Sequence, residues 1–269
     1  MPANVNAVFD DLAPEQVYLC AARVGGIGAN SRRPVDFLLD NMRISSNIIE
    51  AAHAHGVKKL VNLGSSCIYP REAPQPMPES CLMTGALEPT NEGYAIAKIA
   101  ALKLVQAYRR ERGAKFVSVM PTNLYGPGDH YDLEGSHVLP TLIMKFEEAR
   151  VQGHAEVVLW GTGKPLREFL FVEDLADALL LVMDQYDDDE WINIGSDDEV
   201  SIADLALLVA ERVKYRGKIV WDPTRPDGTM RKKLDCSKIR ALGWKPQVSL
   251  TEGIDRTIDD YRMTSSLGR

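Results

Sequence analysis

Short apolar segments alternate with helical patterns along most of the chain, and this alternation limits the fold more than any other feature. Val17 to Ala22, Leu60 to Leu63 and Phe116 to Met120 have the length and composition of buried strands. Apolar residues recur at helical spacing between them, first as far as the stop signal at Gly56 and then from about Thr90 to Arg112. This order is typical of β-α-β units. We therefore expect an α/β protein with a parallel sheet.

The second half of the chain continues the pattern with shorter elements. The expected strands are residues 157–160, 191–194 and 218–221. The expected helices are one opened by Asp174, one capped by Ser201, and a last one after the capping box of Ser249 and Glu252. A chain of 269 residues is long enough for one large core with a smaller lobe beside it.

The composition argues against several classes of protein. The formal charge of -7 and the pI near 5.3 do not suit a nucleic-acid-binding protein, which needs a basic face for phosphate contacts. No apolar run is long enough to span a bilayer, and the first residues do not read as a signal peptide, so we expect no membrane association and a cytoplasmic location. The scattered cysteines form no Cys-x-x-Cys pair, and we expect neither a metal site nor disulfides.

The helical segment contains the sequence YAIAK at positions 94–98. Residues four apart on a helix share a face, so the phenol of Tyr94 is expected beside the ammonium of Lys98. We expect this cation to lower the pKa of Tyr94, which would let the phenol exchange a proton near neutral pH. The spacing alone is weak, because a purely structural helix face gives the same pattern.

A serine pair follows the strand at 60–63, in the sequence GSSCIYP at 64–70. Ligands of doubly wound sheets bind beyond the carboxyl ends of the strands. Ser65 is therefore a candidate to donate a hydrogen bond to a reacting carbonyl. The alternative is that Ser65 and Ser66 have a purely structural role and only form a turn.

Four segments carry a family resemblance: GSSCIYP at 64–70, EPTNEGYAIAK at 88–98, PTNLYGP at 121–127 and REFLFVEDLADA at 167–178. In these segments the chain resembles the GDP-L-fucose synthases, which are extended short-chain dehydrogenases/reductases. The resemblance spans nearly the whole chain and implies a Rossmann-like doubly wound parallel sheet with a smaller α/β substrate domain. It also implies NADPH-dependent conversion of GDP-4-keto-6-deoxymannose to GDP-L-fucose, by C3 and C5 epimerisation and C4 reduction, in a homodimer.

The resemblance assigns catalytic roles to five residues. Ser65 polarises the C4 carbonyl, Tyr94 protonates the developing alkoxide, and Lys98 supports Tyr94 and binds the nicotinamide ribose. Cys67 and His137 exchange protons with C3 and C5. Both carbons flank the carbonyl, so loss of either proton gives an enolate that the same contacts stabilise. Taken alone, Cys67 also fits a small buried hydrophobe, and His137 a loop residue with its hydrogen bonds satisfied.

Further residues are assigned to binding by the same resemblance. The cofactor-binding set is Leu63, Gly64, Lys98, Pro121, Thr122, Asn123, Leu124 and His137. The substrate-binding set is Asn123, Lys145, Trp160, Arg167, Arg231 and Lys232. Cations in this set suit a diphosphate. Lys145 stands where the family usually has arginine, so the bidentate fork of a guanidinium is lost at that contact. We assign residues 1–128 and 157–200 to the Rossmann-like domain, and 129–156 and 201–269 to the substrate domain.

The glycine-rich unit that opens a dinucleotide site of this class is absent from this sequence. The cluster GGIG at 25–28 is a poor match, because Ser31 stands at the third glycine position and Pro34 follows shortly. Aligned by its motifs, the chain begins about two strands into the family pattern, which is compatible with a truncation, a wrong start codon or a real functional loss. We expect NADPH to bind more weakly than a GDP-sugar. Two other functions stay open: a noncatalytic nucleotide-sugar-binding protein, and another extended sugar epimerase.

Overall fold

The computed structural model describes all residues except 1, 133–134, 226 and 268–269. Within this part of the chain, the central sheet consists of four parallel strands in the order β1 (Gln16–Leu19), β2 (Lys59–Leu63), β3 (Phe116–Pro121) and β7 (Ile192–Ile194). Leu60 lies opposite Phe116 in the register, and Val119 lies opposite Ile192. Four of the expected strands form this parallel sheet, the expected strands at 157–160 and 218–221 pair with each other elsewhere, and the α/β fold class is confirmed.

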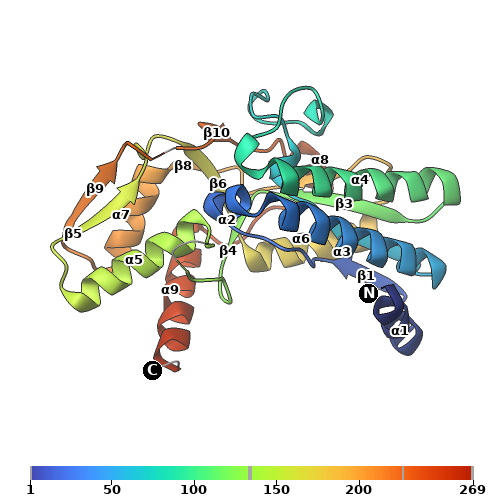
Figure 1. The fold of residues 1–269 in the computed structure, drawn as a ribbon, viewed down its shortest axis with the longest axis horizontal. Helices are drawn as coiled ribbons and strands as arrows, with labels where there is room; N and C mark the ends of the chain where they lie inside the picture. The colour runs from blue at the N-terminus through green and yellow to red at the C-terminus, as the bar shows by residue number, and fades with distance from the viewer. Residues whose placement is uncertain (1, 133–134, 226, 268–269) are drawn as a thin grey trace.

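Helices cover both faces of this sheet (Figure 1). α3 (Pro34–Ala54) and α4 (Glu92–Arg112) lie side by side on one face, and α6 (Val172–Gln185) lies on the other. Leu60 of β2 is buried in the core under α3 and α4, whereas its neighbour Val61 is buried in the core under α6. This alternation follows from the pleat of a strand. Burial on both faces explains why the strands are continuous apolar runs.

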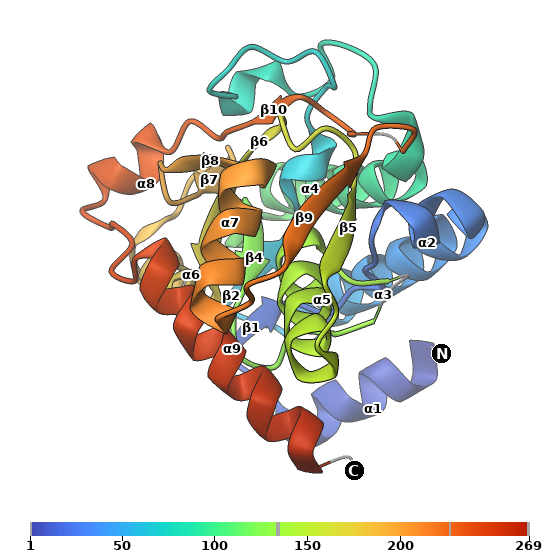
Figure 2. The ribbon, with the colours of Figure 1, turned by 90° about the vertical axis from the view of Figure 1, so that its left-hand side faces the viewer.

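A smaller lobe lies beside the sheet (Figure 2). It contains β5 (Glu156–Trp160) in parallel pairing with β9 (Lys218–Asp222), and the helices α5 (Val138–Gln152), α7 (Ile202–Val213) and α9 (Leu250–Leu267). A third sheet is formed by β4 (Asn123–Tyr125), β6 (Leu166–Phe171), β8 (Glu199–Ser201) and β10 (Arg231–Lys232). β6 links the two parts, because Leu170 packs in a core of the main sheet and Phe171 packs in the core of the lobe.

The helix signals in the sequence were mostly correct. The Ser201 hydroxyl accepts the Asp204 N–H at 3.0 Å and caps α7, and the Ser249 hydroxyl accepts the Glu252 N–H at 3.3 Å at the start of α9. Asp174 is the exception, because α6 begins before it and its carboxylate instead accepts the backbone N–H groups of Gln247 and Val248. Several elements were not expected from the sequence. They are the helices α1 (Pro2–Leu12), α2 (Ile27–Arg32), α5 and α8 (Ser237–Ala241), the strands β4, β6, β8 and β10, and the one-turn helices η1 (Ser66–Ile68), η2 (Glu79–Cys81) and η3 (Pro89–Asn91).

The proposed domain division meets two exceptions in the packing. Residues 157–160 pair with β9 and contribute Val157 to the core of the smaller lobe, although we placed them in the Rossmann-like domain. Ile239 of α8 and the nearby Trp244 pack in a core of the main sheet, although we placed them in the substrate domain. In both cases the segment belongs with the part of the molecule in whose core its apolar side chains are buried, even though that part is built from distant segments of the sequence. The remaining division stays a prediction.

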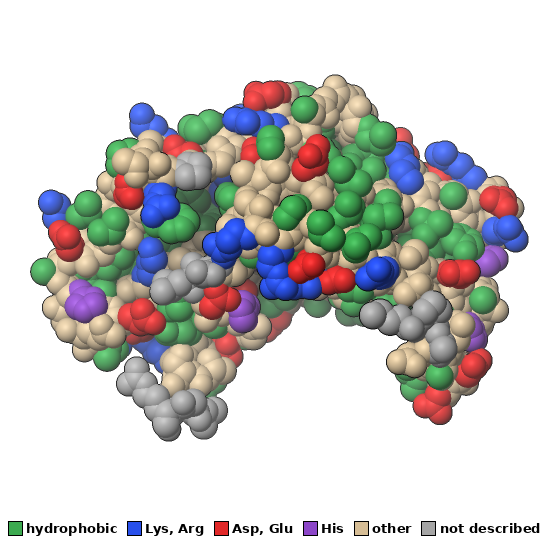
Figure 3. All heavy atoms as spheres, in the orientation of Figure 1, with side chains coloured by type: hydrophobic (Ala, Val, Ile, Leu, Met, Phe, Trp, Pro, Cys, Tyr) green, Lys and Arg blue, Asp and Glu red, His purple; other side chains and the backbone are tan. Residues whose placement is uncertain are grey.

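On the face shown in Figure 3, basic and acidic side chains are interspersed, and the basic ones do not gather into one patch. Among the described helices, none combines the length and the apolar character that crossing a bilayer requires.

Candidate active site

The candidate site begins where β2 ends. Gly64 follows the strand, and a side chain there is excluded because a Cβ would lie 2.3 Å from the Met120 sulfur. The next residue, Ser65, caps η1 by accepting the Cys67 N–H at 3.2 Å. This tight turn holds Ser65 and Cys67 together at the carboxyl edge of the sheet, where parallel α/β proteins bind their ligands.

The Tyr-Lys pair of α4 reaches the same edge. Lys98 is 3% exposed, and its Nζ donates a 2.8 Å hydrogen bond to the Leu63 carbonyl, the last of β2. Its ammonium lies 5.9 Å from the centre of the Tyr94 ring, and the Tyr94 hydroxyl hydrogen-bonds with Ser65. The structure therefore brings together Ser65, Tyr94 and Lys98, which are spread over 34 positions of the sequence.

The prediction that Lys98 lowers the pKa of Tyr94 was wrong. Desolvation by burial raises the pKa of Tyr94, with a further rise from Cys67 and an opposing effect of the Ser65 hydrogen bond. Burial also lowers the pKa of Lys98 to about 8. The physical reason is that both groups are withdrawn from water, and that the Lys98 Nζ is directed at the Leu63 carbonyl. Tyr94 is consequently a phenol that keeps its proton in the free protein.

A lysine from the C-terminal region completes the surroundings of Cys67. Lys232 of β10 places its Nζ 3.3 Å from the Cys67 sulfur, across 165 positions of sequence. Burial opposes ionisation of Cys67, but the charge of Lys232, hydrogen bonds from Ser65 and Lys232, and the charge of Arg167 outweigh it and lower the pKa of the thiol.

His137 stands at the N-terminus of α5 with its side chain exposed. Desolvation by the surrounding chain lowers its pKa, Asp129 opposes that change, and Lys232 adds to it. Lys232 thus acts electrostatically on both Cys67 and His137. The two expected acid-base residues share one cationic neighbour.

The other expected cations divide into two groups. Arg167 of β6 is half-buried, and burial lowers its pKa, with Cys67 among the groups that oppose this change. Arg231 instead forms a bidentate ion pair with Glu199, with N–O distances of 2.8 and 2.5 Å. Its charge is already compensated within the protein, so the diphosphate role expected for it lacks support.

Lys145 and Trp160 lie on the smaller lobe. The Lys145 Nζ donates to the Val158 carbonyl at 3.1 Å, and burial lowers its pKa. Trp160 is 59% exposed, and the Arg225 guanidinium lies 4.9 Å from the centre of its ring. Trp160 is therefore not a core residue, and its ring is accessible to a ligand.

The loop after β3 is fixed by side-chain hydrogen bonds to the backbone of β6. Pro121 ends the strand, and the Thr122 hydroxyl and the Asn123 amide both donate to the Glu168 carbonyl, at 3.2 and 2.8 Å. Leu124 follows in β4. These contacts hold the expected cofactor loop against β6, next to Arg167.

Two pockets adjoin these residues. One, of about 260 Å³, is lined by Tyr94 and the start of α4, and the other is lined by Cys67 and Lys232. Asn91 lines both, and its side-chain oxygen is buried without a hydrogen-bond partner among the residues that the structure describes. Asn91 was not among the expected site residues, although it lies in the EPTNEGYAIAK segment, directly before the Tyr94 helix.

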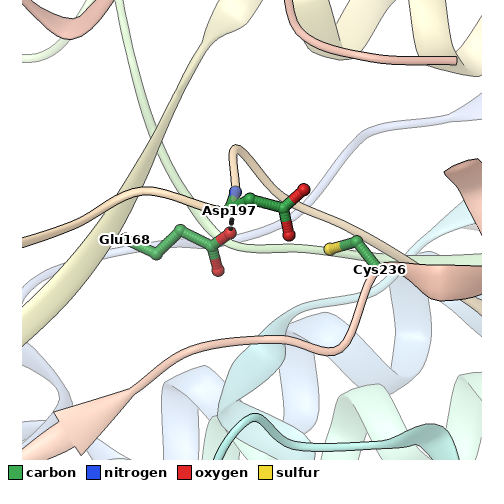
Figure 4. A group of neighbouring side chains, drawn as sticks. All are labelled: Glu168, Asp197 and Cys236. Carbon is green, nitrogen blue, oxygen red and sulfur yellow. Dashed lines mark hydrogen bonds between the residues drawn. The ribbon is translucent and has the colours of Figure 1, made fainter.

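A buried carboxylate behind the site was also missed. Glu168 is 0% exposed and accepts the backbone N–H groups of Asp197 at 2.8 Å and Leu234 at 3.1 Å (Figure 4). Potential ligand atoms of Glu168, Asp197 and Cys236 lie within 4.8 Å of one another. However, the Glu168 oxygens already accept hydrogen bonds and Asp197 is paired with Arg240, so we assign this group a structural role. The sequence signal that could have revealed this buried carboxylate is the position of Glu168 inside the largely apolar strand segment LREFLF.

Replacing Glu168 with glutamine is expected to destabilise the protein. The amide can accept only one of the two backbone N–H groups well, and an unsatisfied buried donor costs about 1–3 kcal/mol. Urea unfolding followed by circular dichroism measures the effect. Glu173→Gln is the matched control, because this α6 residue is 58% exposed in a surface ion pair with Arg256. Equal unfolding midpoints for the two variants contradict the role assigned to Glu168.

The fold and this geometry define a class of protein. A parallel sheet, a serine after one strand, a Tyr-x-x-x-Lys helix beside it and a second lobe make an extended short-chain dehydrogenase/reductase. Residues 1–195 match the model of the NAD dependent epimerase/dehydratase family, and the chain belongs to that family.

Individual relatives narrow the comparison. GDP-L-fucose synthase 1 of Arabidopsis thaliana is 56% identical over 259 residues, covering 96% of this chain and 80% of that protein. A GDP-6-OMe-4-keto-L-xylo-heptose reductase of C. jejuni superposes with a TM-score of 0.92 at 32% identity, covering 98% of this chain and 87% of that one. A GDP-L-fucose synthetase of Naegleria fowleri, bound to NADP, gives a TM-score of 0.90 at 30% identity, covering 99% and 83%.

Proposed function

We propose that this protein converts GDP-4-keto-6-deoxymannose to GDP-L-fucose by C3 and C5 epimerisation followed by NADPH-dependent reduction at C4. The observation that carries this proposal is the position of Cys67. Its thiol lies next to the Ser65 hydroxyl and Lys232, at the same sheet edge as Tyr94. Reduction alone needs no such ionisable thiol. The high identity with the Arabidopsis enzyme supports the same reaction.

The site residues suit both parts of this reaction. Ser65 and Tyr94 are placed to hydrogen-bond the C4 oxygen, and these contacts stabilise the enolate formed when C3 or C5 loses a proton. Cys67 and His137 exchange the protons at those carbons. Tyr94 then gives its proton to the C4 oxygen during reduction, which matches a phenol that stays protonated in the free protein.

The residues at the sheet edge fit the nicotinamide end of NADP(H). NADPH, when bound, supplies the hydride for C4. The buried ammonium of Lys98 lies beside the Leu63 carbonyl, where it is placed to meet ribose hydroxyls. Gly64 leaves the backbone free of a side chain at this point. Pro121, Thr122 and Leu124 complete the proposed contact, with Asn123 shared between cofactor and substrate.

The GDP-sugar is held by side chains from both parts of the chain. Arg167 and Lys145 are the proposed partners of the diphosphate, because each is a cation partly withdrawn from water. The exposed ring of Trp160 offers a stacking surface for an aromatic base. Lys145 and Trp160 lie on the smaller lobe, whereas Arg167 lies on β6, which links the lobe to the main sheet.

The purified chain tests this function directly with GDP-4-keto-6-deoxymannose and NADPH. We expect NADPH oxidation together with formation of GDP-L-fucose, identified by NMR. Calorimetry with GDP accompanies the assay. GDP binding without NADPH oxidation favours the noncatalytic nucleotide-sugar-binding protein, and sugar inversion without net NADPH consumption favours another sugar epimerase.

The proposed homodimer has a candidate surface on α3 and α4. Val35, Leu39 and Met42 of α3 are 64%, 41% and 42% exposed, and Ile96 of α4 is 43% exposed. These positions follow helical spacing and form an apolar strip on the outer side of the helix pair. A second copy of the same pair covers such a strip in a four-helix bundle.

Met42→Glu is expected to convert the dimer to a monomer, because a carboxylate in the centre of an apolar interface loses its hydration. Light scattering coupled to size exclusion reports the mass. Leu180→Glu is the control, because Leu180 is 60% exposed on α6, across the sheet. A dimer that survives Met42→Glu, or one that Leu180→Glu disrupts, places the interface elsewhere.

The cytoplasm remains the proposed compartment. All four cysteines are free thiols in the structure. A reducing environment preserves them, including the thiol of Cys67 on which the proposed epimerisation depends.

A further inference from the structure

β10 is a two-residue strand held at a fixed position over the Cys67 pocket. It pairs in parallel with β6, so that Lys232 lies opposite Arg167. Gln75 holds it from the other side, donating to the Arg231 carbonyl at 3.2 Å and accepting the Lys233 N–H at 2.9 Å. The backbone on both sides of Lys232 is therefore anchored, and its side chain starts from a defined point.

Strand alternation aims Lys232 at the sulfur. Arg231 and Lys233 both turn toward Glu199, at 2.5 and 4.0 Å, and Lys233 also donates to the Asp197 carbonyl. Since successive side chains of a strand point to opposite faces, Lys232 turns the other way and meets Cys67 at 3.3 Å. Its two neighbours have carboxylate partners, whereas the partner of Lys232 is a thiol.

We infer that Lys232 is a positioning residue that keeps Cys67 in the thiolate form, and that it serves the epimerisation in this way rather than as a ligand of the diphosphate. The inference rests on the proposed function. A thiolate accepts a proton, which a thiol cannot do, and a nearby ammonium favours the thiolate electrostatically. Without Lys232, the desolvation of Cys67 favours the neutral thiol.

Other charged groups around the sulfur do not replace Lys232. Arg167 also favours the thiolate, but it acts through its charge alone, and its guanidinium donates to the Leu166 carbonyl. Glu88 and Arg71, which line the same pocket, are 3.6 Å apart and compensate each other. Among the described residues, several titratable or charged groups face the sulfur or its pocket. They are Lys232 of β10, Arg167 of β6, Tyr94 of α4, His137 at the start of α5, Tyr69 after η1, and Glu88 and Arg71 of the loop between η1 and α4.

Alkylation by iodoacetamide measures the thiolate of Cys67 without any substrate. The rate is followed by peptide mass spectrometry as a function of pH, with the exposed Cys20 as an internal reference. We expect Lys232→Met to slow alkylation of Cys67 at neutral pH by ~10-fold, which corresponds to a rise of about one pKa unit. Its pH midpoint moves upward accordingly. Lys232→Arg keeps the charge and is expected to restore most of the rate.

The matched control is Arg231→Met, which removes the adjacent cation on the opposite face of the strand. It should leave Cys67 alkylation unchanged. If Lys232→Met does not fold, Lys232→Gln provides the neutral comparison with a polar side chain. A wild-type rate and pH midpoint in a folded neutral variant overturn the inference. Failure of the wild-type protein to turn over the GDP-keto-sugar overturns the proposed function instead, and leaves the alkylation result standing.

Discussion

Replacing Tyr94 with phenylalanine is expected to lower the rate of C4 reduction by about 10²- to 10⁴-fold, the range typical for loss of a general acid. The substitution removes the proton that the C4 oxygen receives and keeps the ring. NADPH oxidation measured with GDP-4-keto-6-deoxymannose at saturation reports this step. Because Tyr94 holds its proton in the free protein, the loss should appear in turnover rather than in substrate binding.

Tyr108→Phe is the matched control on the same helix. Tyr108 lies near the C-terminal end of α4, away from Tyr94 at its start, and packs against the rings of His53 and Phe116. We expect this variant to reduce substrate at the wild-type rate. If Tyr94→Phe reduces substrate equally well, another group protonates C4 and the role assigned to Tyr94 is wrong.

Replacing Cys67 with serine is expected to impair inversion at C3 and C5 by at least about 10²-fold, with a smaller effect on C4 reduction. A hydroxyl of the same shape does not ionise near neutral pH, so Lys232 no longer has a base to stabilise. Incorporation of solvent deuterium at C3 and C5 measures inversion independently of hydride transfer.

Cys20→Ser is the control for this experiment, because Cys20 is an exposed thiol outside the proposed acid-base pair. It should incorporate deuterium normally. Normal incorporation by Cys67→Ser means that a different residue exchanges protons with the sugar, and the epimerase part of the proposal then loses its main support.

The helices and strands of the main sheet were predictable because their signals are local. α3 ends at Ala54, and Gly56 follows two residues later with φ of 72°, as expected for a stop signal. α4 presents Tyr94 and Lys98 on one face because of its period. The serine after β2 was predictable for the same reason, since parallel strands place their carboxyl ends at one edge.

The site features that the sequence did not predict depend on contacts between residues far apart in the chain. Arg231 and Lys232 are adjacent and equally basic in the sequence, yet one is paired with Glu199 and the other faces Cys67. Nothing local distinguishes them, because the direction of a two-residue strand is fixed by its pairing with β6. Glu168 was overlooked because its partners lie 29 and 66 positions away.

Periodicity predicted the fold class, and strand ends and helix spacing predicted that Ser65, Tyr94 and Lys98 meet, because these signals act within one element or between neighbouring strands. The family resemblance, not the spacing, pointed to Cys67, His137 and Lys232. The tertiary structure decided the ionisation of those residues. Burial raises the pKa of Tyr94, against the local expectation, and an ammonium 165 positions away lowers that of Cys67. A pKa depends on how much water surrounds a group and which charges lie within a few ångströms, and only the folded chain sets those two quantities.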